Sequence, residues 1–404
     1  MAVKVPIDVE PPTTDQLREV LATVIDPELG ADIVTLGMVP GIEVSADGLV
    51  TVTIKLTIGG CPLRADIKRD VERRISVHPG VRDVVIEWGE MTPDERSVVM
   101  SKARWNARQH AGETRVPTRT RVLAIASGKG GVGKSSVTAN LAVALARRGR
   151  TVGVLDADIW GFSMPRLLGV KDRLEAQAVA GSDRPLIRPN ERRIGEGRLQ
   201  IVSTGFLVDE DTALMWRGLM LTKAVEQFLR DVDWGDLDDL LIDLPPGTGD
   251  VQMGLARMLP QAQMVVVTTP ARAAQKVAQR AADMARRSFV SVVGVIENMT
   301  AFTCRHGDRY ALFGEGGGEA LAAAVEVPLL GQVPLEPAVA AGGDAGQPVA
   351  GIDDATPGSA AAVFAAIARR LDDVAPSPGI GADGVDLAGC SARLLATVEA
   401  AFDD

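Results

Sequence analysis

The chain has 404 residues, which at roughly 150 residues per domain indicates two or three domains. Apolar residues make up 46% but aromatic residues only 3%, so the cores must consist of Ala, Val, Leu and Ile, as is typical of parallel sheets covered by helices. The formal net charge of −10 argues against a protein that holds DNA or an anionic membrane through a generally basic surface.

Targeting segments and disulfides are not expected. The first twenty residues lack the charged start and apolar run of a signal peptide, and no later stretch reaches the roughly 18 apolar residues of a membrane span. We therefore expect a soluble, cytoplasmic protein. The cysteines, Cys61, Cys304 and Cys390, lie far apart, which favours thiol or metal-ligand roles over a disulfide scaffold. A metal site built from them would need more than one chain.

Residues 1–100 predict a small α+β domain. Thr13 and Gln16 have the spacing of a capping box, and apolar residues then recur every three or four positions, so a helix should begin there. Strict apolar alternation over residues 50–58 predicts a strand with one buried face. A helix from about Leu63 and a short strand over residues 81–86 complete the domain.

Residues 101–120 are predicted to hold the end of a further helix and an interdomain linker. Thr92 and Glu95 have capping-box spacing for the start of that helix, and the stretch that follows it is polar and without period. For residues 373–404 the sequence predicts a tail without an assigned fold, with one short helix candidate over residues 388–402.

Residues 121–372 predict a larger α/β domain. Continuous apolar strands separated by helical segments are typical of a mainly parallel sheet with helices on both faces. The predicted strands are residues 122–127, 151–156, 199–205, 239–245, 263–270 and 290–298.

The segment Gly128–Ser135 fits the pattern G-x-x-x-x-G-K-[ST] between a buried strand and a helix, which predicts a phosphate-binding loop. Its glycines let successive N–H groups point at phosphate oxygens next to a helix N-terminus. Lys134 would neutralise the β and γ phosphates, and Ser135 would bind Mg²⁺. A glycine-rich turn without function is the alternative. The predicted nucleotide-binding residues are Gly128, Lys129, Gly130, Gly131, Val132, Gly133, Lys134, Ser135, Ser136 and Asn298.

The stretch KGGVGKS, with its second lysine at Lys129, resembles the deviant Walker A ATPases, a group that includes Mrp/ApbC, MinD, ParA, the nitrogenase iron protein and the arsenite-pump ATPases. In that group the residue equivalent to Lys129 reaches across a dimer interface to the partner's nucleotide. The resemblance therefore implies a homodimer that closes on ATP. An exposed, solvated lysine is the alternative.

Two further segments resemble the same ATPases. Asp156 and Asp158 end a predicted strand, and the resemblance implies that Asp158 positions the attacking water while Asp156 is structural. LLIDLPPGTGD, residues 240–250, resembles a Walker B strand, in which Asp243 holds Mg²⁺ through water and residues 247–249 shape a switch. A buried Asp243 with a merely structural partner is the alternative. By the same resemblance Asn298 contacts adenine. The predicted catalytic residues of this slow ATPase are Lys129, Lys134, Asp158 and Asp243.

Four segments together resemble the Mrp/ApbC family of iron–sulfur cluster carriers: WRGLM, DLPPGTGD, GVIENMTAF and LFGEGGG, within residues 216–318. The front domain resembles the small iron–sulfur assembly (MIP-type) domain often fused to these carriers. Cys61, in TIGGCP, falls on the motif cysteine of that domain. A small buried apolar role for Cys61 is the alternative.

In that family a C-x-x-C pair from each of two chains bridges a cluster, so four thiolates surround the iron. Here the corresponding residues are Cys304, Arg305, His306 and Gly307, so the second cysteine is replaced by glycine. Two chains would offer two thiolates. His306 completes a Cys/His ligand set in one interpretation, and in the other the loop has kept a single cysteine without binding a cluster.

The resemblance implies an ATP-hydrolysing homodimer that transfers iron–sulfur clusters to apoproteins and meets assembly factors. Two alternatives stay open. One is a positioning or partition ATPase of the MinD/ParA type, which binds membrane or DNA. The acidic end LLATVEAAFDD argues against its membrane form, which calls for a basic amphipathic helix. The other is a nucleotide-gated scaffold without a cluster. We expect neither a nucleic acid nor a membrane as partner.

Overall fold

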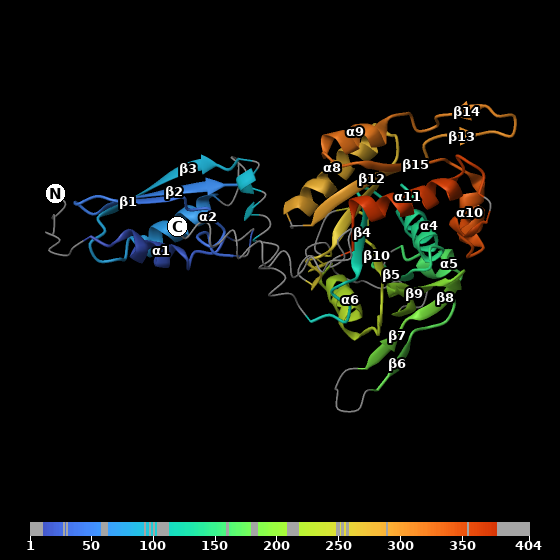
Figure 1. Ribbon diagram of the computed structural model, residues 1–404, viewed down its shortest axis with the longest axis horizontal. Helices are drawn as coiled ribbons and strands as arrows, with labels where there is room; N and C mark the ends of the chain where they lie inside the picture. The colour runs from blue at the N-terminus through green and yellow to red at the C-terminus, as the bar shows by residue number, and fades with distance from the viewer. Residues whose placement is uncertain are drawn as a thin grey trace. The chain divides into compact units, whose positions relative to one another are not determined.

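The computed structural model divides into two compact units, residues 1–110 and residues 111–404, and each is considered by itself (Figure 1). The residues that the structure describes are 11–26, 29, 31–57, 64–92, 94–96, 98–99, 102, 113–158, 161–178, 185–207, 218–247, 251, 254–255, 258–287, 290–353 and 355–377.

The first unit packs two helices on a three-stranded sheet. The predicted capping box is present, because the Thr13 hydroxyl accepts the Gln16 N–H and the Gln16 side chain accepts the Thr13 N–H. Strand alternation is also confirmed, since every second residue of the central strand is buried. The elements are α1 (Thr14–Leu21), β1 (Gly41–Val44), β2 (Leu49–Leu56), α2 (Arg64–Ile75) and β3 (Asp83–Glu90).

The strand predicted over residues 81–86 begins later and runs further, as β3. β3 pairs in parallel with all eight residues of β2, from Leu49 opposite Asp83 to Leu56 opposite Glu90, so the partner strand sets its length. After it, Thr92 and Glu95 form the predicted capping box: the Glu95 carboxylate accepts the Thr92 N–H at 2.8 Å and the Thr92 hydroxyl accepts the Glu95 N–H at 3.3 Å.

The second unit contains an eight-stranded sheet in the order β15-β12-β11-β4-β10-β5-β9-β8. All neighbours pair in parallel except β8, which is antiparallel to β9. Its strands are β4 (Arg121–Ser127), β5 (Thr151–Asp156), β8 (Asn190–Ile194), β9 (Gly197–Ser203), β10 (Asp239–Asp243), β11 (Gln263–Thr268), β12 (Ser291–Asn298) and β15 (Leu329–Val333).

The six predicted strands are confirmed to within two residues at either end, and the predicted α/β class with a mainly parallel sheet holds. Sequence patterns did not predict β8 or β15, the two strands at the sheet edges. The sequence of β8 is NERRI and none of its residues is fully buried, and β15 buries only Leu330 and Val333. Neither therefore has the continuous apolar run by which a central strand is detected.

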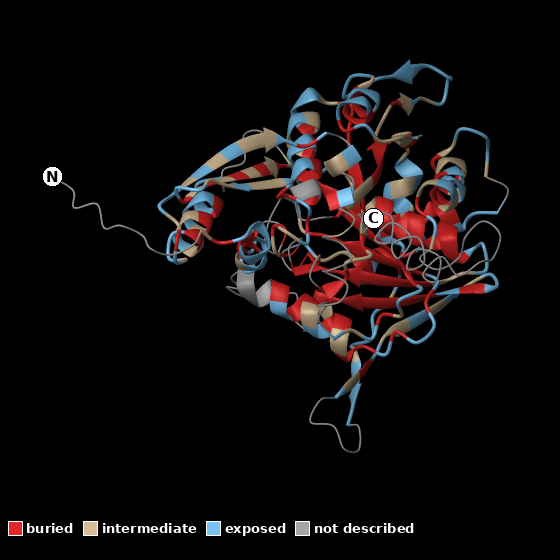
Figure 2. Cartoon of the chain, turned by 60° about the vertical axis from the view of Figure 1, so that its left-hand side comes forward, coloured by how far each residue is buried: buried red, intermediate tan, exposed pale blue. Residues whose placement is uncertain are grey.

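Helices cover both faces of this sheet, and successive strand residues point to opposite faces. Leu123 and Ile125 pack in the same core as α4, α5 and α11, whereas Val122 and Ala124 pack with α6, α8 and α9. Figure 2 shows the buried strands lying between these layers. The helices are α4 (Lys134–Ala146), α5 (Met164–Leu167), α6 (Gly218–Asp231), α8 (Arg272–Arg287), α9 (Gly317–Ala324), α10 (Pro337–Asp344) and α11 (Ala360–Val374).

Short elements complete the unit. Two two-stranded ribbons are β6 (Glu175–Gln177) with β7 (Leu186–Arg188), and β13 (Phe302–Thr303) with β14 (Arg309–Tyr310). Two 3₁₀ turns are η1 (Thr204–Leu207) and η2 (Val349–Gly351). Cys61, Thr248, Gly249, Cys390 and the helix predicted over residues 388–402 lie outside the described residues. Within the described part of the chain, no helix is long and apolar enough to cross a membrane.

Candidate nucleotide site and cysteine hairpin

The predicted phosphate-binding loop connects the buried strand β4 to α4, and its glycines have separate structural reasons. Gly131 and Gly133 have φ values of +80° and +78°, in the left-handed region that glycine adopts without strain. Gly133 is the N-cap of α4, so the helix begins where the loop ends. At Gly128 a Cβ atom would overlap the backbone of Val277 in α8. The loop is thus built for close backbone approach.

Three of the predicted side chains meet behind this loop. Lys134 Nζ lies 2.7 Å from Asp243 Oδ2, and the Ser135 hydroxyl donates to the same oxygen at 2.6 Å. They meet because β10 lies beside β4 in parallel, which places Asp243 opposite Ile125 near the carboxyl end of both strands. Asp243 is fully buried. Lys134 and Ser135 therefore both contact this carboxylate, and the magnesium role of Asp243 stays a prediction.

Sequence reasoning missed Thr138, which completes the cluster. Its hydroxyl donates to Asp243 Oδ1 at 2.8 Å, so both carboxylate oxygens of Asp243 have partners. Thr138 also lies at hydrogen-bond distance, 3.0 Å, from the Lys134 carbonyl oxygen one turn earlier. The available signal was its spacing, because a residue four positions after Lys134 lies on the same face of α4.

The neighbouring strand β5 brings a second carboxylate, Asp156, into register with Asp243. Asp156 Oδ2 accepts the N–H groups of Ser163 and Met164 at 3.0 and 3.1 Å and the Ser203 hydroxyl at 3.1 Å. Burial, and after it the charge of Asp243, raise the pKa of Asp156 to about 7. Asp156 therefore orders the segment after β5, in agreement with the structural role expected for it.

Asp158, the predicted water-positioning residue, is 9% exposed at the same edge of the sheet. Its Oδ1 atom accepts the Gly161 N–H at 3.2 Å, which ties the side chain to the turn that follows. Lys129 is exposed, and its backbone is held because its carbonyl oxygen accepts the Ser127 hydroxyl at 3.1 Å. Its reach to a partner and the role of Asp158 stay predictions.

Asn298, expected to contact adenine, is 7% exposed at the end of β12. Its Nδ2 atom donates to the carbonyl oxygen of Val132 at 2.9 Å, so the side chain supports the phosphate-binding loop. A Cβ atom on Gly133 would overlap the same amide nitrogen. The contact with adenine stays a prediction, whereas the contact with the loop was not foreseen.

Cys304 lies in the hairpin between β13 and β14, away from the buried cluster. The Gly307 N–H donates to the Cys304 carbonyl oxygen at 3.0 Å, and Gly307 has a φ of +91°. Cys304 Sγ accepts the His306 N–H at 3.4 Å and lies 3.7 Å from Asp308 Oδ2. The turn thus brings a carboxylate, Asp308, to the thiol, which the sequence reading did not single out.

Comparison with known proteins decides the family. A family model described as ParA, NUBPL iron-transfer P-loop NTPase, matches residues 118–372. The chain belongs to this family. A second model, described as an iron-sulfur cluster assembly protein, matches residues 14–88 in the first unit. Both parts of the predicted resemblance are thereby confirmed, and with them the P-loop NTPase fold.

Several relatives of this NUBPL-family chain span most of its length. The iron-sulfur cluster carrier protein of Mycobacterium tuberculosis (strain ATCC 25618 / H37Rv) is 44% identical over 341 residues, which cover 82% of this chain and 87% of the relative. The iron-sulfur cluster carrier protein of Synechocystis sp. is 41% identical over 361 residues, which cover 89% of this chain and 97% of the relative. Among solved structures, a nucleotide-binding protein from Archaeoglobus fulgidus in complex with ADP is 34% identical, covers 60% of this chain and 91% of its own, and has a TM-score of 0.48.

The NUBPL-family hairpin offers few side chains of the kinds that bind iron. In the described residues Cys304 is the free cysteine, and no group of three or more His, Cys, Asp or Glu side chains could hold a metal ion. A cysteine at position 307 would need the left-handed backbone of Gly307, which L side chains rarely adopt. The departure from C-x-x-C is therefore built into the turn, and a full cluster needs ligands from outside this hairpin.

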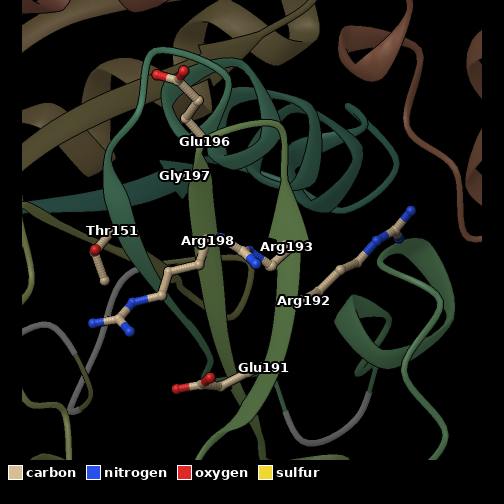
Figure 3. Close-up of a pocket in the computed structure, with 7 residues that line it drawn as sticks. All are labelled: Thr151, Glu191, Arg192, Arg193, Glu196, Gly197 and Arg198. Atoms are coloured by element: carbon tan, nitrogen blue, oxygen red, sulfur yellow. The ribbon is translucent and has the colours of Figure 1, made fainter.

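A surface hollow of about 400 Å³ lies at the other edge of the NUBPL-family sheet, where β5 and β9 begin (Figure 3). The Arg192 and Arg198 side chains point to opposite sides in Figure 3, and Arg192 donates to the Leu168 carbonyl oxygen at 2.6 Å. The arginines therefore do not converge on one ligand. The lining residues are Thr151, Glu191, Arg192, Arg193, Glu196, Gly197 and Arg198.

Proposed function

We propose that this NUBPL-family protein is an ATPase that acts as a homodimer and carries iron–sulfur clusters to apoproteins. One observation carries the ATPase part: Lys134, Ser135 and Asp243 join within 2.7 Å behind a glycine loop at a helix N-terminus. Family membership and relatives named iron-sulfur cluster carrier proteins support the cargo.

The phosphates of ATP bind the loop N–H groups, where the dipole of α4 favours negative charge. Lys134 turns from Asp243 to the β and γ phosphates, which offer it a stronger concentration of negative charge. Ser135 and Asp243 suit Mg²⁺, because a hydroxyl and a carboxylate 2.6 Å apart are the oxygen donors that a hard cation prefers. When bound there, Mg²⁺ neutralises charge on the phosphates.

Asp158 orients the attacking water in this proposal. Its tie to the Gly161 N–H limits the motion of the carboxylate, and phosphoryl transfer depends mostly on such positioning. Lys129 acts on the nucleotide of the partner subunit, since its side chain is exposed on a fixed backbone. Closure of two copies therefore completes each site, which makes hydrolysis depend on dimerisation.

The cargo binds at the hairpins of two copies, each of which contributes Cys304. His306 and Asp308 are the neighbouring donors, and Asp308 Oδ2 lies within 3.7 Å of the thiol. The first unit, with Cys61, meets apoproteins and assembly factors. We place the protein in the cytoplasm, where thiols stay reduced.

Anaerobic reconstitution with iron and sulfide tests the cargo. The wild type is expected to gain visible absorbance and bound iron, Cys304→Ala to lose most of both, and Cys61→Ala to lose any share held by the first unit. Cys390→Ala is the matched control, because it removes a thiol outside both motifs. A wild type without bound iron would sink the cluster-carrying half of the proposal.

A separate assay tests the ATPase half. Lys129→Ala is expected to stop hydrolysis while the circular dichroism spectrum and the thermal unfolding midpoint stay those of the wild type, because the side chain is exposed. Unchanged turnover would mean that Lys129 does not act across a dimer. Analytical ultracentrifugation with Mg²⁺ and a non-hydrolysable ATP analogue measures the dimer directly.

One observation favours a second candidate, a nucleotide-gated scaffold without a cluster. Gly307 occupies a left-handed turn position at the place of a second cysteine, so the hairpin is shaped for glycine rather than for a C-x-x-C pair. The two candidates differ in the reconstitution experiment: the scaffold hydrolyses ATP but binds no iron.

A further inference from the structure

The last two residues of β12, Glu297 and Asn298, each hold a different part of the second unit. Glu297 accepts the Gly318 N–H at the start of α9, and its other oxygen accepts the Gln332 side-chain amide at 3.0 Å. Asn298 donates to the phosphate-binding loop at Val132. Met299 follows directly after the strand. The phosphate-binding loop and the start of α9 are therefore both held by residues 297–298 at the end of β12.

Met299 itself lies against the loop. Its Cε methyl group is 3.3 Å from the place where a Cβ atom of Gly133 would stand, so the side chain covers the glycine that caps α4. Gly133 leaves room for Asn298 and Met299 together. Any rearrangement of the loop on binding phosphates changes what these two side chains contact.

The backbone of Met299 is strained. Its φ of +58° is left-handed, a conformation that costs an unbranched L residue free energy and that favours glycine or asparagine. Among the described residues Glu326 is the other non-glycine with positive φ, at +53°. Glu326 follows the C-cap of α9, where a left-handed residue is ordinary. Met299 does not end a helix, so local capping does not explain it, and such outliers often mark functional segments.

The chain on either side of the Cys304 hairpin is connected to residues 297–299. On the outgoing side Met299 precedes Thr300, which donates to the Val333 carbonyl oxygen at 3.0 Å, and Cys304 follows five residues after Met299. On the returning side the chain reaches Gly318, which Glu297 holds. The hairpin between them projects beyond α9 and β15 in Figure 1 and is largely exposed in Figure 2. A change of backbone angle at Met299 therefore acts on the hairpin through Thr300 and Ala301, whose carbonyl oxygen accepts the Leu335 N–H at 2.8 Å.

We propose that Met299 is the positioning residue through which the phosphate-binding loop sets the orientation of the Cys304 hairpin. The inference rests on the proposed function, to which it adds the link between nucleotide and cargo. Two states of the Met299 backbone, one for the loop with phosphates and one for the loop without, give the thiol two orientations. The strain at Met299 keeps these states close in free energy.

The test measures Cys304 in the full chain with and without a saturating complex of Mg²⁺ and ADP, after titration has established that this nucleotide binds. Peptide-resolved mass spectrometry gives the rate at which iodoacetamide alkylates Cys304, so the other cysteines need not be replaced. In the wild type we expect bound nucleotide to change this rate by about fivefold or more, in the range of measured couplings between sites.

Met299→Gly removes both the side chain on Gly133 and the strain, so nucleotide should still bind but no longer change the alkylation rate. Met299→Leu keeps an apolar side chain and the strain, and should retain the change. The matched control is Glu326→Gly, which relieves the other left-handed residue at the far end of α9 and should behave as the wild type.

The outcomes separate the two proposals. Failure of nucleotide to bind overturns the proposed function and this inference with it. Bound nucleotide without an effect on wild-type Cys304, or an equal effect in Met299→Gly, overturns the inference alone. If Met299→Gly does not fold, hydrogen exchange in the wild type decides: bound nucleotide must slow or speed exchange over residues 299–304 but leave residues 325–327 unchanged.

Discussion

The phosphate-binding loop and the Cys304 hairpin belong to the same unit but are stabilised in opposite ways. In the loop, Gly128 lies against the backbone of α8 and Gly133 against the Asn298 side chain, and the fully buried carboxylate of Asp243 binds three side chains. In the hairpin, Cys304 is held by bonds within a five-residue turn whose side chains are mostly exposed. The loop is thus fixed by many distant partners, and the hairpin by its own turn.

Because of this difference, we expect substitutions to have different effects in the two regions. A substitution at a packed loop position such as Gly128 disturbs a neighbouring element as well, because α4, α8, β10 and β12 all contact the loop. A substitution in the hairpin is felt locally, since few of its contacts involve the core. Four measurements test that contrast.

The largest effect is expected for Lys134→Ala. Its ammonium group neutralises the phosphates in the proposed mechanism, so the rate of ATP hydrolysis should fall by about 100-fold or more, as for removal of a single preorganised donor. Steady-state phosphate release measures it. Lys276→Ala is the control, an exposed lysine on α8 whose loss should leave the rate unchanged. Equal losses in both variants would contradict the assignment.

Gly128→Ala should lower the free energy of unfolding by about 1–3 kcal/mol, because the new methyl group overlaps the α8 backbone at Val277. Gly130→Ala is the matched control in the same loop. No atom lies within 4 Å of a Cβ at Gly130, so its change should stay within about 0.5 kcal/mol. Urea denaturation measures both, and a similar loss in the two variants would mean that the close approach is not limiting.

The loop region should also respond to pH through Asp156. Its pKa in the folded chain is about 7, above the ordinary aspartate pKa of 3.8, so between these pH values the folded state holds a proton that the unfolded state has released. Its contribution to stability is therefore present below about pH 4 and is lost as the pH rises through about 7. Unfolding free energies without Mg²⁺ or nucleotide should fall more steeply over this range in the wild type than in Asp156→Asn. Parallel profiles would contradict the raised pKa.

The smallest effect is expected in the hairpin. Gly307→Ala places a Cβ atom at a φ of +91°, which costs about 1 kcal/mol, and the exposed turn can relax part of that cost. Gly307→Asn is the control, because asparagine tolerates a left-handed backbone better than alanine. Thermal unfolding should rank glycine, asparagine and alanine in that order. A loss as large as that of Gly128→Ala would erase the contrast between the two regions.

Much of the fold was predictable because its signals are local. The capping box at Thr13 and Gln16, the alternation within β2 and the continuous apolar runs of the central strands each depend on neighbouring residues. Edge strands β8 and β15 were missed, since a strand with one neighbour is buried less and carries a weaker apolar pattern. The length of β3 was wrong because its partner, not its own composition, sets it.

The site likewise has features that local sequence predicts and features that depend on the tertiary structure. The spacing of Gly128, Gly133, Lys134 and Ser135 determined a phosphate-binding loop from the sequence alone, because backbone conformation and helix start are encoded by adjacent residues. Asp243 was assigned from a motif, but its contact with Lys134 depends on the order of the strands. Cys61 lies outside the described residues, so its assignment stays a prediction.

By itself the sequence determined the P-loop, the α/β class and the loss of a second cysteine at Gly307. Only the tertiary structure decided that Thr138 shares Asp243, that Asn298 supports the loop and that Met299 is strained between the loop and the hairpin. These contacts join residues far apart in the chain, and a side chain's partner across 100 or more positions follows from strand order and packing rather than from local pattern.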